Sequence, residues 1–407
     1  MRIPQPVPNK GTVMKLKHFA LVVTLAPMLA YGQSVQTFII DPQPSGQSLE
    51  KTVDFFTSTT TPSVVMGTDN GIYLYTSSSG SLSGPWVMTT IDPAGNFYER
   101  SAALLFPGDT YPGVVASRSG QLVVYFNPTN WGGDPTQLWP AWVINPNAGC
   151  NDLHVADLDQ DGLPDVVCSA TSLYGTKSFI AFQNNPNDWE IVDDPFRIPG
   201  SPDSIGDGIA VLSIHGGPRI NVVGATNSGV YWFKNPKLNG GNPRRDLWKG
   251  FFVGDGDPGA TIGTGVFNPS RESIVVASYE ETFANGLVWY EPHANPHTPW
   301  ISHIVDSTYR DVHQINTGDF YGTPYFIVGE IEQACGTPEI EGDHPGLPCR
   351  VTMFLFGHGS FSPFLIYDQG THNQSVVPYN GGLLVVGANH DVYGTLYPAL
   401  QAWFISE

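Results

Sequence analysis

Four aspartates near the middle of the chain have the spacing of a cation-binding loop. The segment "DLDQDGLPD" places Asp157, Asp159, Asp161 and Asp165 at alternate positions, and Gly162 permits a sharp turn. Hard cations such as Ca²⁺ take about six to eight oxygen ligands, which carboxylates in a tight loop can supply. No helical pattern flanks the loop, so it is not an EF-hand. The sequence therefore predicts a structural Ca²⁺ site that pins a turn.

Three histidines and a glutamate form a second group that could do chemistry. They are His313, Glu330, His372 and His390, and we expect them to be catalytic. Imidazoles with a carboxylate can hold Zn²⁺ or another divalent ion as a Lewis acid. Alternatively, one His or Glu acts as a general base with a pKa near the working pH. Each histidine alone could equally cap a strand or bond a neighbouring backbone group, so the prediction depends on their coming together.

A repeat of the chain supplies the elements that would bring these residues together. Seven segments share one form: β-branched apolar residues, a small residue, polar residues and then an aromatic strand. They start at Ser63, Gly113, Asp165, Arg219, Ser273, Tyr325 and Leu383, so successive starts lie 50 to 58 residues apart. One such unit cannot bury both faces of its sheet, but seven arranged radially can. Ig-like sandwiches need about 100 residues each. The sequence thus predicts an all-β fold, a seven-bladed β-propeller of four-stranded antiparallel blades, over residues 33–407.

Strand direction predicts where the polar residues of this propeller lie. Antiparallel neighbours make the chain alternate in direction, so residues before each first strand and after each second strand share one face near the axis. The four catalytic candidates belong to this face. The candidate substrate-binding residues there are Arg100, Asp152, His154, Asp207, Tyr279, Glu332, Asn373 and Asn389. The acidic loop joins a first to a second strand and is expected on the opposite face.

Several motifs resemble known propeller families. "HVADLDQDGLPDVV" is similar to the FG-GAP/VCBS repeat of integrin-type propellers. "DVHQINTGDFYG" with "YFIVGEIEQ", and "THNQSVVPYNGGLLVVGANHDVYG", resemble the propeller part of fungal aldos-2-ulose dehydratases, which dehydrate 1,5-anhydro-fructose or glucosone. The resemblance implies a carbon–oxygen lyase. In that reaction His313 or His372 is the expected base, Glu330 an acid or ligand, and His390 a ligand or oxyanion donor.

Two other carbohydrate functions fit the same pattern. The first is a lectin or adhesion propeller without catalysis, which should repeat similar binding motifs in several blades. Here the polar motifs differ from blade to blade, which favours one central site. The second is a polysaccharide lyase that removes a uronate proton, and an exposed groove would favour it. In each case the expected partner is a small carbohydrate or a glycan, and the oligomeric state stays open.

Composition and the N-terminus limit the other classes of partner. The formal net charge of −19 speaks against nucleic acid, which binds clustered Lys and Arg. Residues 1–32 read as a signal peptide: Lys15 and Lys17 precede a short apolar run, and Ala30 and Gly32 suit a cleavage site. No apolar segment is long enough to span a membrane. We therefore expect a secreted protein.

Four cysteines in a secreted chain predict two disulfides. Cys150 and Cys168 flank the turn of the acidic loop, and Cys335 and Cys349 flank an insertion rich in Pro and Gly. Free buried thiols are the alternative. Asn373 begins an N-glycosylation sequon, and a glycan there would obstruct the predicted pocket.

Overall fold

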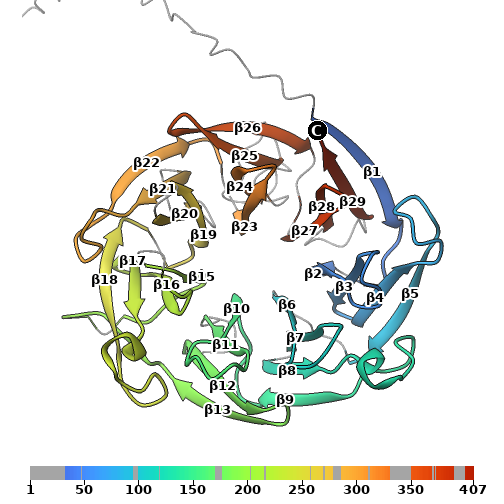
Figure 1. Ribbon diagram of the computed structural model, residues 1–407, viewed down its shortest axis with the longest axis horizontal. Helices are drawn as coiled ribbons and strands as arrows, with labels where there is room; N and C mark the ends of the chain where they lie inside the picture. The colour runs from blue at the N-terminus through green and yellow to red at the C-terminus, as the bar shows by residue number, and fades with distance from the viewer. Residues whose placement is uncertain are drawn as a thin grey trace, which may run out of the picture.

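The computed structural model describes residues 33–407, except for 47, 95–99, 119, 170–176, 202, 215–216, 257, 269–270, 278–285, 310–311, 331–349, 369–370, 372 and 389–398. Its sheets form a closed ring of seven blades, seen end-on in Figure 1. The seven-bladed propeller that the repeat predicts is confirmed. Within the described ranges, no helix is both long and apolar enough to cross a membrane.

Each blade is an antiparallel sheet whose first strand lies nearest the axis (Figure 1). Blade 1 contains β2 (Ser48–Asp54), β3 (Ser63–Thr68), β4 (Gly71–Ser77) and β5 (Trp86–Asp92). Blade 2 contains β6 (Ser101–Leu104), β7 (Gly113–Arg118), β8 (Gln121–Tyr125) and β9 (Ala141–Asn145). Blade 3 contains β10 (Leu153–Ala156), β11 (Asp165–Cys168), β12 (Phe179–Asn185) and β13 (Asp188–Asp193).

Blades 4 to 6 repeat this order. Blade 4 contains β15 (Ile209–Leu212), β16 (Asn221–Thr226), β17 (Gly229–Lys234) and β18 (Trp248–Gly254), and β14 (Phe196–Arg197) adds a short parallel fifth strand. Blade 5 contains β19 (Thr261–Asn268), β20 (Arg271–Ala277), β21 (Leu287–Glu291) and β22 (Ile301–Asp306). Blade 6 contains β23 (Val312–Phe320), β24 (Thr323–Glu330), β25 (Val351–Gly357) and β26 (Ser360–Tyr367).

Blade 7 closes the ring with a strand from the other end of the described chain. It contains β27 (Asn373–Tyr379), β28 (Gly382–Ala388) and β29 (Leu400–Ser406), and β1 (Ser34–Asp41) is its outer strand. β1 pairs antiparallel with β29, so that Ser34 lies opposite Ser406. The sequence pattern predicts that the fourth strand of each blade follows its third strand in the chain. In blade 7 the fourth strand is instead β1, which precedes blade 1. Because this pairing ties the first blade to the last, it covers an edge that would otherwise be open.

The core of the ring lies between the blades. Seven hydrophobic clusters of described residues each join one pair of adjacent blades. The β-branched second strands are buried on both faces; in β16, for example, every residue is buried. The aromatic residues Trp232, Trp289 and Tyr290 are also buried between blades.

Two asparagine-capped connections hold neighbouring blades together. The 3-10 helices η1 (Pro128–Trp131) and η3 (Pro236–Asn239) follow β8 and β17, and Asn127 and Asn235 cap them. The Asn127 amide donates to the carbonyl of Phe56 in blade 1 at 2.7 Å, and the Asn235 amide donates to the carbonyl of Leu158 in blade 3 at 2.7 Å. The connection after β17 is thereby fixed against the acidic loop of blade 3.

Candidate functional site

The inner strands bring residues of every blade to one end of the axis. β2, β6, β10, β15, β19, β23 and β27 surround the axis in Figure 1. They run in one direction because each blade repeats the same order of antiparallel strands. Residues at or just before their N-terminal ends therefore gather at one end of the ring, which we call the pocket end. The acidic loop follows β10 and lies at the opposite end.

Arg100, just before β6, is the centre of a buried network that crosses the axis. Its Nε donates to Asp152 Oδ1 at 2.8 Å, and its Nη1 donates to Asn373 Oδ1 at 2.5 Å. Its Nη2 donates to the backbone carbonyl of His313. These partners belong to blades 3, 7 and 6, whereas Arg100 belongs to blade 2. Arg100 is 7% exposed, so these charge-assisted bonds are shielded from water.

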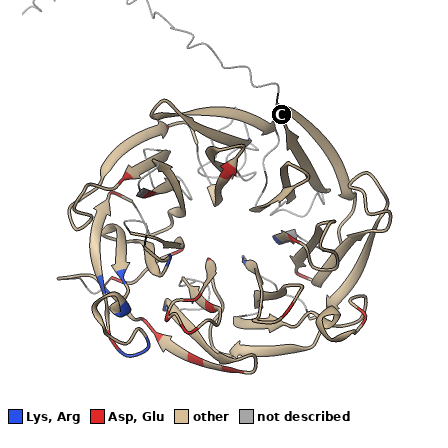
Figure 2. Ribbon diagram, viewed as in Figure 1, with Lys and Arg blue, Asp and Glu red and all other residues tan. Residues whose placement is uncertain are grey.

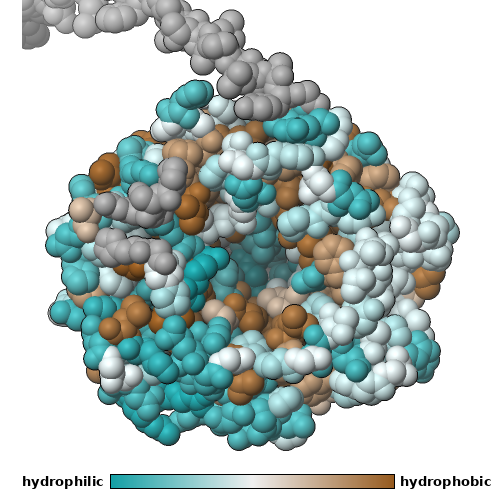
Figure 3. All heavy atoms as spheres, viewed as in Figure 1, coloured by the Kyte–Doolittle hydropathy of each residue, from teal (hydrophilic) through white to brown (hydrophobic). Residues whose placement is uncertain are grey.

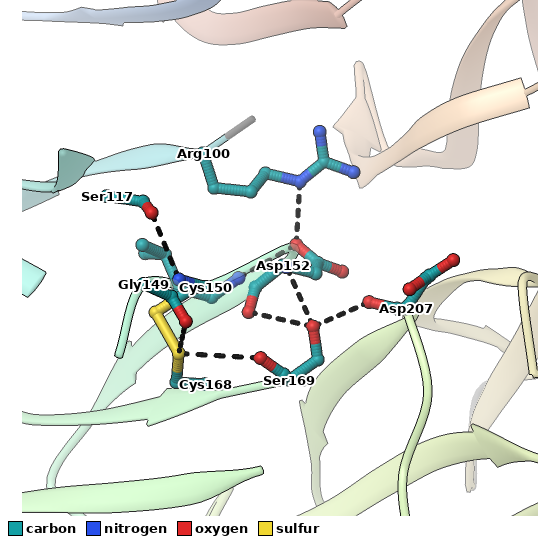
Figure 4. Close-up of a disulfide and its surroundings, with 9 residues drawn as sticks. Arg100, Ser117, Gly149, Cys150, Asp152, Cys168, Ser169 and Asp207 are labelled. Atoms are coloured by element: carbon teal, nitrogen blue, oxygen red, sulfur yellow. Dashed lines mark hydrogen bonds and ion pairs between the residues drawn. A yellow bond between two sulfur atoms is a disulfide. The ribbon is translucent and has the colours of Figure 1, made fainter. Parts of the chain in front are cut away.

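A disulfide holds the segment that carries Asp152. Figure 4 shows Asp152 between Arg100 and Ser169, beside the bonded sulfurs. Cys150 and Cys168 are joined and buried, which confirms one of the two predicted disulfides. The backbone N–H of Asp152 donates to Ser169 Oγ at 2.7 Å. The cross-link therefore ties the residues before β10 to the end of β11, and this connection fixes the position of the Asp152 carboxylate.

A small cavity opens beside this network. It has a volume of about 20 Å³, room for about one water molecule, and the ring is hollowed at its axis (Figure 3). Its lining residues are Arg100, Asn151, Asp207, Gly208, Gly259, Thr261 and His313. Gly208 is required for the close approach of blades 4 and 5, because a Cβ there would lie 2.0 Å from the carbonyl oxygen of Ala260. The cavity combines a guanidinium, a carboxylate and an imidazole, which can bind hydroxyl groups, stabilise negative charge and transfer protons.

Glu50 in β2 belongs to the network, although the sequence analysis does not single it out. Its Oε2 accepts a hydrogen bond from Asn373 Nδ2 at 3.1 Å, and its side chain is buried. Burial raises the pKa of Glu50 to about 8, against the lowering effects of Arg100 and Lys51. The signal in the sequence was the charged pair Glu50-Lys51 within an inner strand.

Asn373 and His154 occupy defined places in the same region. Asn373 is fully buried and both ends of its amide are bonded, so the folded ring leaves no room for a glycan on this residue. His154 lies in β10, one residue into the strand. Burial lowers the pKa of His154, and the nearby Asp152 opposes that shift. The substrate-binding roles of both residues stay predictions.

Glu330 lies at the pocket end, but its carboxylate is engaged by Arg350. Arg350 donates from Nε to Glu330 Oε2 at 2.8 Å and from Nη2 to Oε1 at 3.1 Å. The guanidinium of Arg350 in turn stacks over the ring of Tyr309, 3.8 Å from its centroid. The Glu330 carboxylate is 1% exposed. A bidentate buried pair of this kind can support the fold, and the cavity lining does not include Glu330, whose catalytic role stays a prediction.

Several residues of the sequence predictions lie outside the described residues. They are the catalytic candidates His372 and His390, the substrate-binding candidates Tyr279, Glu332 and Asn389, and the cysteines Cys335 and Cys349. A central Zn²⁺ site built from the three histidines accordingly stays a prediction.

The acidic loop brings three of its four aspartates together. Ligand oxygens of Asp157, Asp159 and Asp165 lie within 4.8 Å of one another. Asp159 Oδ1 is buried and has no hydrogen-bond partner. Burial raises the pKa of Asp165 to about 8, and the neighbouring Asp159 adds to this effect. An orphaned oxygen among converging carboxylates fits a hard cation such as Ca²⁺.

Asp161 instead pairs with Arg244 of blade 4, a base that Asp159 shares. Arg244 donates from Nε to Asp159 Oδ2 at 2.5 Å and from Nη2 to Asp161 Oδ2 at 3.1 Å. The ammonium of Lys237 donates to the backbone carbonyl of Asp159. In Figure 2, basic residues of blade 4 lie beside acidic residues of blade 3 at the lower left of the ring. The four loop carboxylates, when ionised, carry a charge of −4, and Lys237 and Arg244 together carry +2. The remaining charge of −2 matches one divalent cation.

Comparison with models of known protein families finds no matching family, and comparison with curated protein sequences finds no significant relative. The class of the protein is therefore given by its fold, a seven-bladed β-propeller. Its resemblance to FG-GAP repeats and to aldos-2-ulose dehydratases rests on the motifs of the sequence.

Proposed function

We propose that this chain is a secreted, carbohydrate-active propeller that eliminates water from a keto-sugar such as 1,5-anhydro-fructose. The observation that supports the proposal is the axial cavity, where Arg100, Asp207 and His313 come from three different blades. A base, a cation and a hydrogen-bonding carboxylate around one small space are the groups that an elimination beside a carbonyl needs.

In this proposal one histidine moves the proton. His313 accepts the proton from the carbon beside the carbonyl, and the electron pair of that C–H bond forms an enediolate. Arg100 stabilises the negative charge on the enediolate oxygen. The C–O bond at the next carbon then breaks, and the protonated His313 gives its proton to the departing hydroxyl, which leaves as water. The products are an unsaturated ketone and water, and His313 returns to its neutral form.

The test is turnover of 1,5-anhydro-fructose by the purified protein, followed by the ultraviolet absorbance of the conjugated ketone. His313→Gln should lower the rate by about 10²- to 10⁴-fold, the usual contribution of a general base. His293→Gln is the matched control, because His293 is exposed on an outer loop and should leave the rate unchanged. Saturable sugar binding without turnover by the wild type would replace the lyase with the lectin alternative.

We also propose that Asp157, Asp159 and Asp165 hold one Ca²⁺ that pins the turn between β10 and β11. The converging oxygens, the orphaned Asp159 Oδ1 and the remaining charge of −2 support this ion. A ligand that binds only the native state lowers the free energy of that state, so the melting temperature rises. When bound ions are first removed with a chelator, adding calcium should therefore raise the melting temperature. Asp159→Asn should abolish this rise, whereas Asp188→Asn, at an exposed residue, should keep it.

A further inference from the structure

We propose that a groove at the end of the ring opposite the pocket end binds a neutral saccharide chain. The groove has a volume of about 550 Å³ and lies where blades 6, 7 and 1 meet. It is formed by the turns after three successive inner strands, β23, β27 and β2. Phe55, Thr59, Asp319, Tyr321, Tyr379 and Asn380 are among the residues that line it. It is separate from the axial cavity, since the two lie at opposite ends of the inner strands.

Tyr321 is the residue that points to a ligand. It is the first residue of the two-residue turn between β23 and β24, and its φ is +52°. A bulky residue with positive φ is an outlier, whereas Asn, Asp and His are several-fold enriched there. The equivalent turn of blade 7 shows the favoured solution, Asn380-Gly381, with φ values of +45° and +75°. Blade 6 thus has a strained tyrosine at the position where the neighbouring blade 7 has Asn380, a residue type that tolerates positive φ.

The ring of Tyr321 is held in place and exposed. It makes an edge-to-face contact with Phe320, at 4.7 Å between centroids, and Phe320 is buried. Its hydroxyl lies 3.7 Å from the position that a Cβ on Gly381 would take, so the side chain leans toward blade 7. Tyr321 is nevertheless 52% exposed. A fixed aromatic surface that stays open to solvent is suited to stacking against a ligand.

The other lining residues identify the chemistry of that ligand. The amide of Asn380, the hydroxyl of Thr59 and the carboxylate of Asp319 surround the aromatic rings, and all three residues are exposed. Among the described residues, no Lys or Arg lines the groove, so nothing there would recognise a phosphate or another anion. A pyranose ring presents apolar C–H faces to an aromatic ring and hydroxyl groups to the sides. The groove offers partners for both, and its volume of about 550 Å³ suits more than one sugar unit.

The test is calorimetric titration of the purified full-length protein with cellohexaose, laminarihexaose and maltohexaose. We expect the wild type to bind at least one of these hexasaccharides. Tyr321→Asn should weaken that binding at least about tenfold, and Tyr321→Phe should keep it within about threefold, because the ring carries the contact. Tyr321→Asn should also unfold at the same or a higher temperature, since asparagine suits a positive φ. Loss of binding with undiminished stability would separate ligand recognition from folding.

Two control variants test whether the loss of binding is specific to this groove. His358→Asn alters a similar positive-φ turn in the outer hairpin of blade 6 and should leave binding unchanged. His313→Gln should also leave it unchanged, because His313 lines the axial cavity. The proposal is overturned if the wild type binds none of the three hexasaccharides, or if Tyr321→Asn binds them as tightly as the wild type. Either result leaves the proposed reaction at the axial cavity standing.

Discussion

Two arginines contact carboxylates at opposite ends of the ring, and they link different parts of it. Arg100 pairs with Asp152 of the adjacent blade 3 and also reaches across the axis to blades 6 and 7, through the carbonyl of His313 and Asn373. Arg244 reaches only sideways, from blade 4 to Asp159 and Asp161 of blade 3. The hydrophobic clusters of the described residues join adjacent blades, such as 3 and 4, and none of them joins blades on opposite sides of the axis. We infer that Arg100, through Asn373 and the carbonyl of His313, joins blades that packing alone leaves apart, while its pair with Asp152, like the pairs of Arg244, reinforces an interface that packing has already made.

The strongest way to break this comparison is to remove Arg100. In Arg100→Met the buried carboxylate of Asp152 loses its charged partner, and an uncompensated buried charge typically costs about 3–5 kcal/mol. Urea unfolding of the two proteins measures the difference in the free energy of unfolding. Arg245→Met is the control, because Arg245 is exposed and pairs with Glu190 at the surface; it should change stability by less than about 0.5 kcal/mol. Equal effects of the two variants would contradict the axial role of Arg100.

The second test removes the disulfide that fixes Asp152. Cys150→Ala with Cys168→Ala opens a cross-link whose ends are 18 residues apart in the chain. A cross-link of that span typically stabilises by about 2–4 kcal/mol, so the melting temperature of the double variant should fall. If the disulfide also positions Asp152, a further Arg100→Met change should cost less in this background than in the wild type. Strict additivity of the changes would show that the disulfide and the axial network act independently.

The third test uses the pH dependence of Glu50. Its pKa is about 8 in the folded protein against 4.5 for an ordinary glutamate, so the folded state retains a proton that the unfolded state releases. This contribution to stability is fully present below about pH 4.5 and is lost as the pH rises toward 8. Glu50→Gln should remove that part of the slope, by at least about 1.4 kcal/mol, the equivalent of one pKa unit. The urea midpoint of both proteins between pH 5 and 8 measures it, and parallel profiles would refute it.

The smallest effect is expected at Arg244. Blade 2 has a similar connection with Thr136 at the equivalent position, so Arg244→Thr introduces a residue that the connection accommodates. The side chains of Arg244 and Asp159 are only 15% and 10% exposed, but a bound ion still compensates the carboxylates, so in calcium we expect a loss below about 3–5 kcal/mol, the cost of an uncompensated buried charge. After chelation the loss of stability from Arg244→Thr should be larger, because the loop carboxylates then lack both the Ca²⁺ ion and the Arg244 guanidinium. Thermal unfolding in calcium and in EDTA measures both values, and an equal loss in the two buffers would contradict the idea that Arg244 and the ion share the charge of the loop.

Much of the site region could be predicted from the sequence because it depends on local pattern and strand direction. The alternation of strands places Arg100, Asp152, Asp207 and His313 at one end of the ring, and the structure has them there. Glu50 could not be predicted because a charged residue in a largely polar strand looks exposed until its partners Asn373 and Arg100 in the adjacent blades are known. Glu330 was assigned to the pocket by position alone, yet its carboxylate turns to Arg350, which enters β25 after the long segment 331–349.

The sequence by itself determined the number of blades, the order of strands within them and the disulfide Cys150–Cys168, because periodicity and spacing act along the chain. Only the tertiary structure decided that β1 completes blade 7, that Arg100 crosses the axis and that Tyr321 borders a groove shared by three blades. These contacts join residues that lie in different blades, in some cases hundreds of positions apart. Closing the ring sets the distances between them, and no local pattern records those distances.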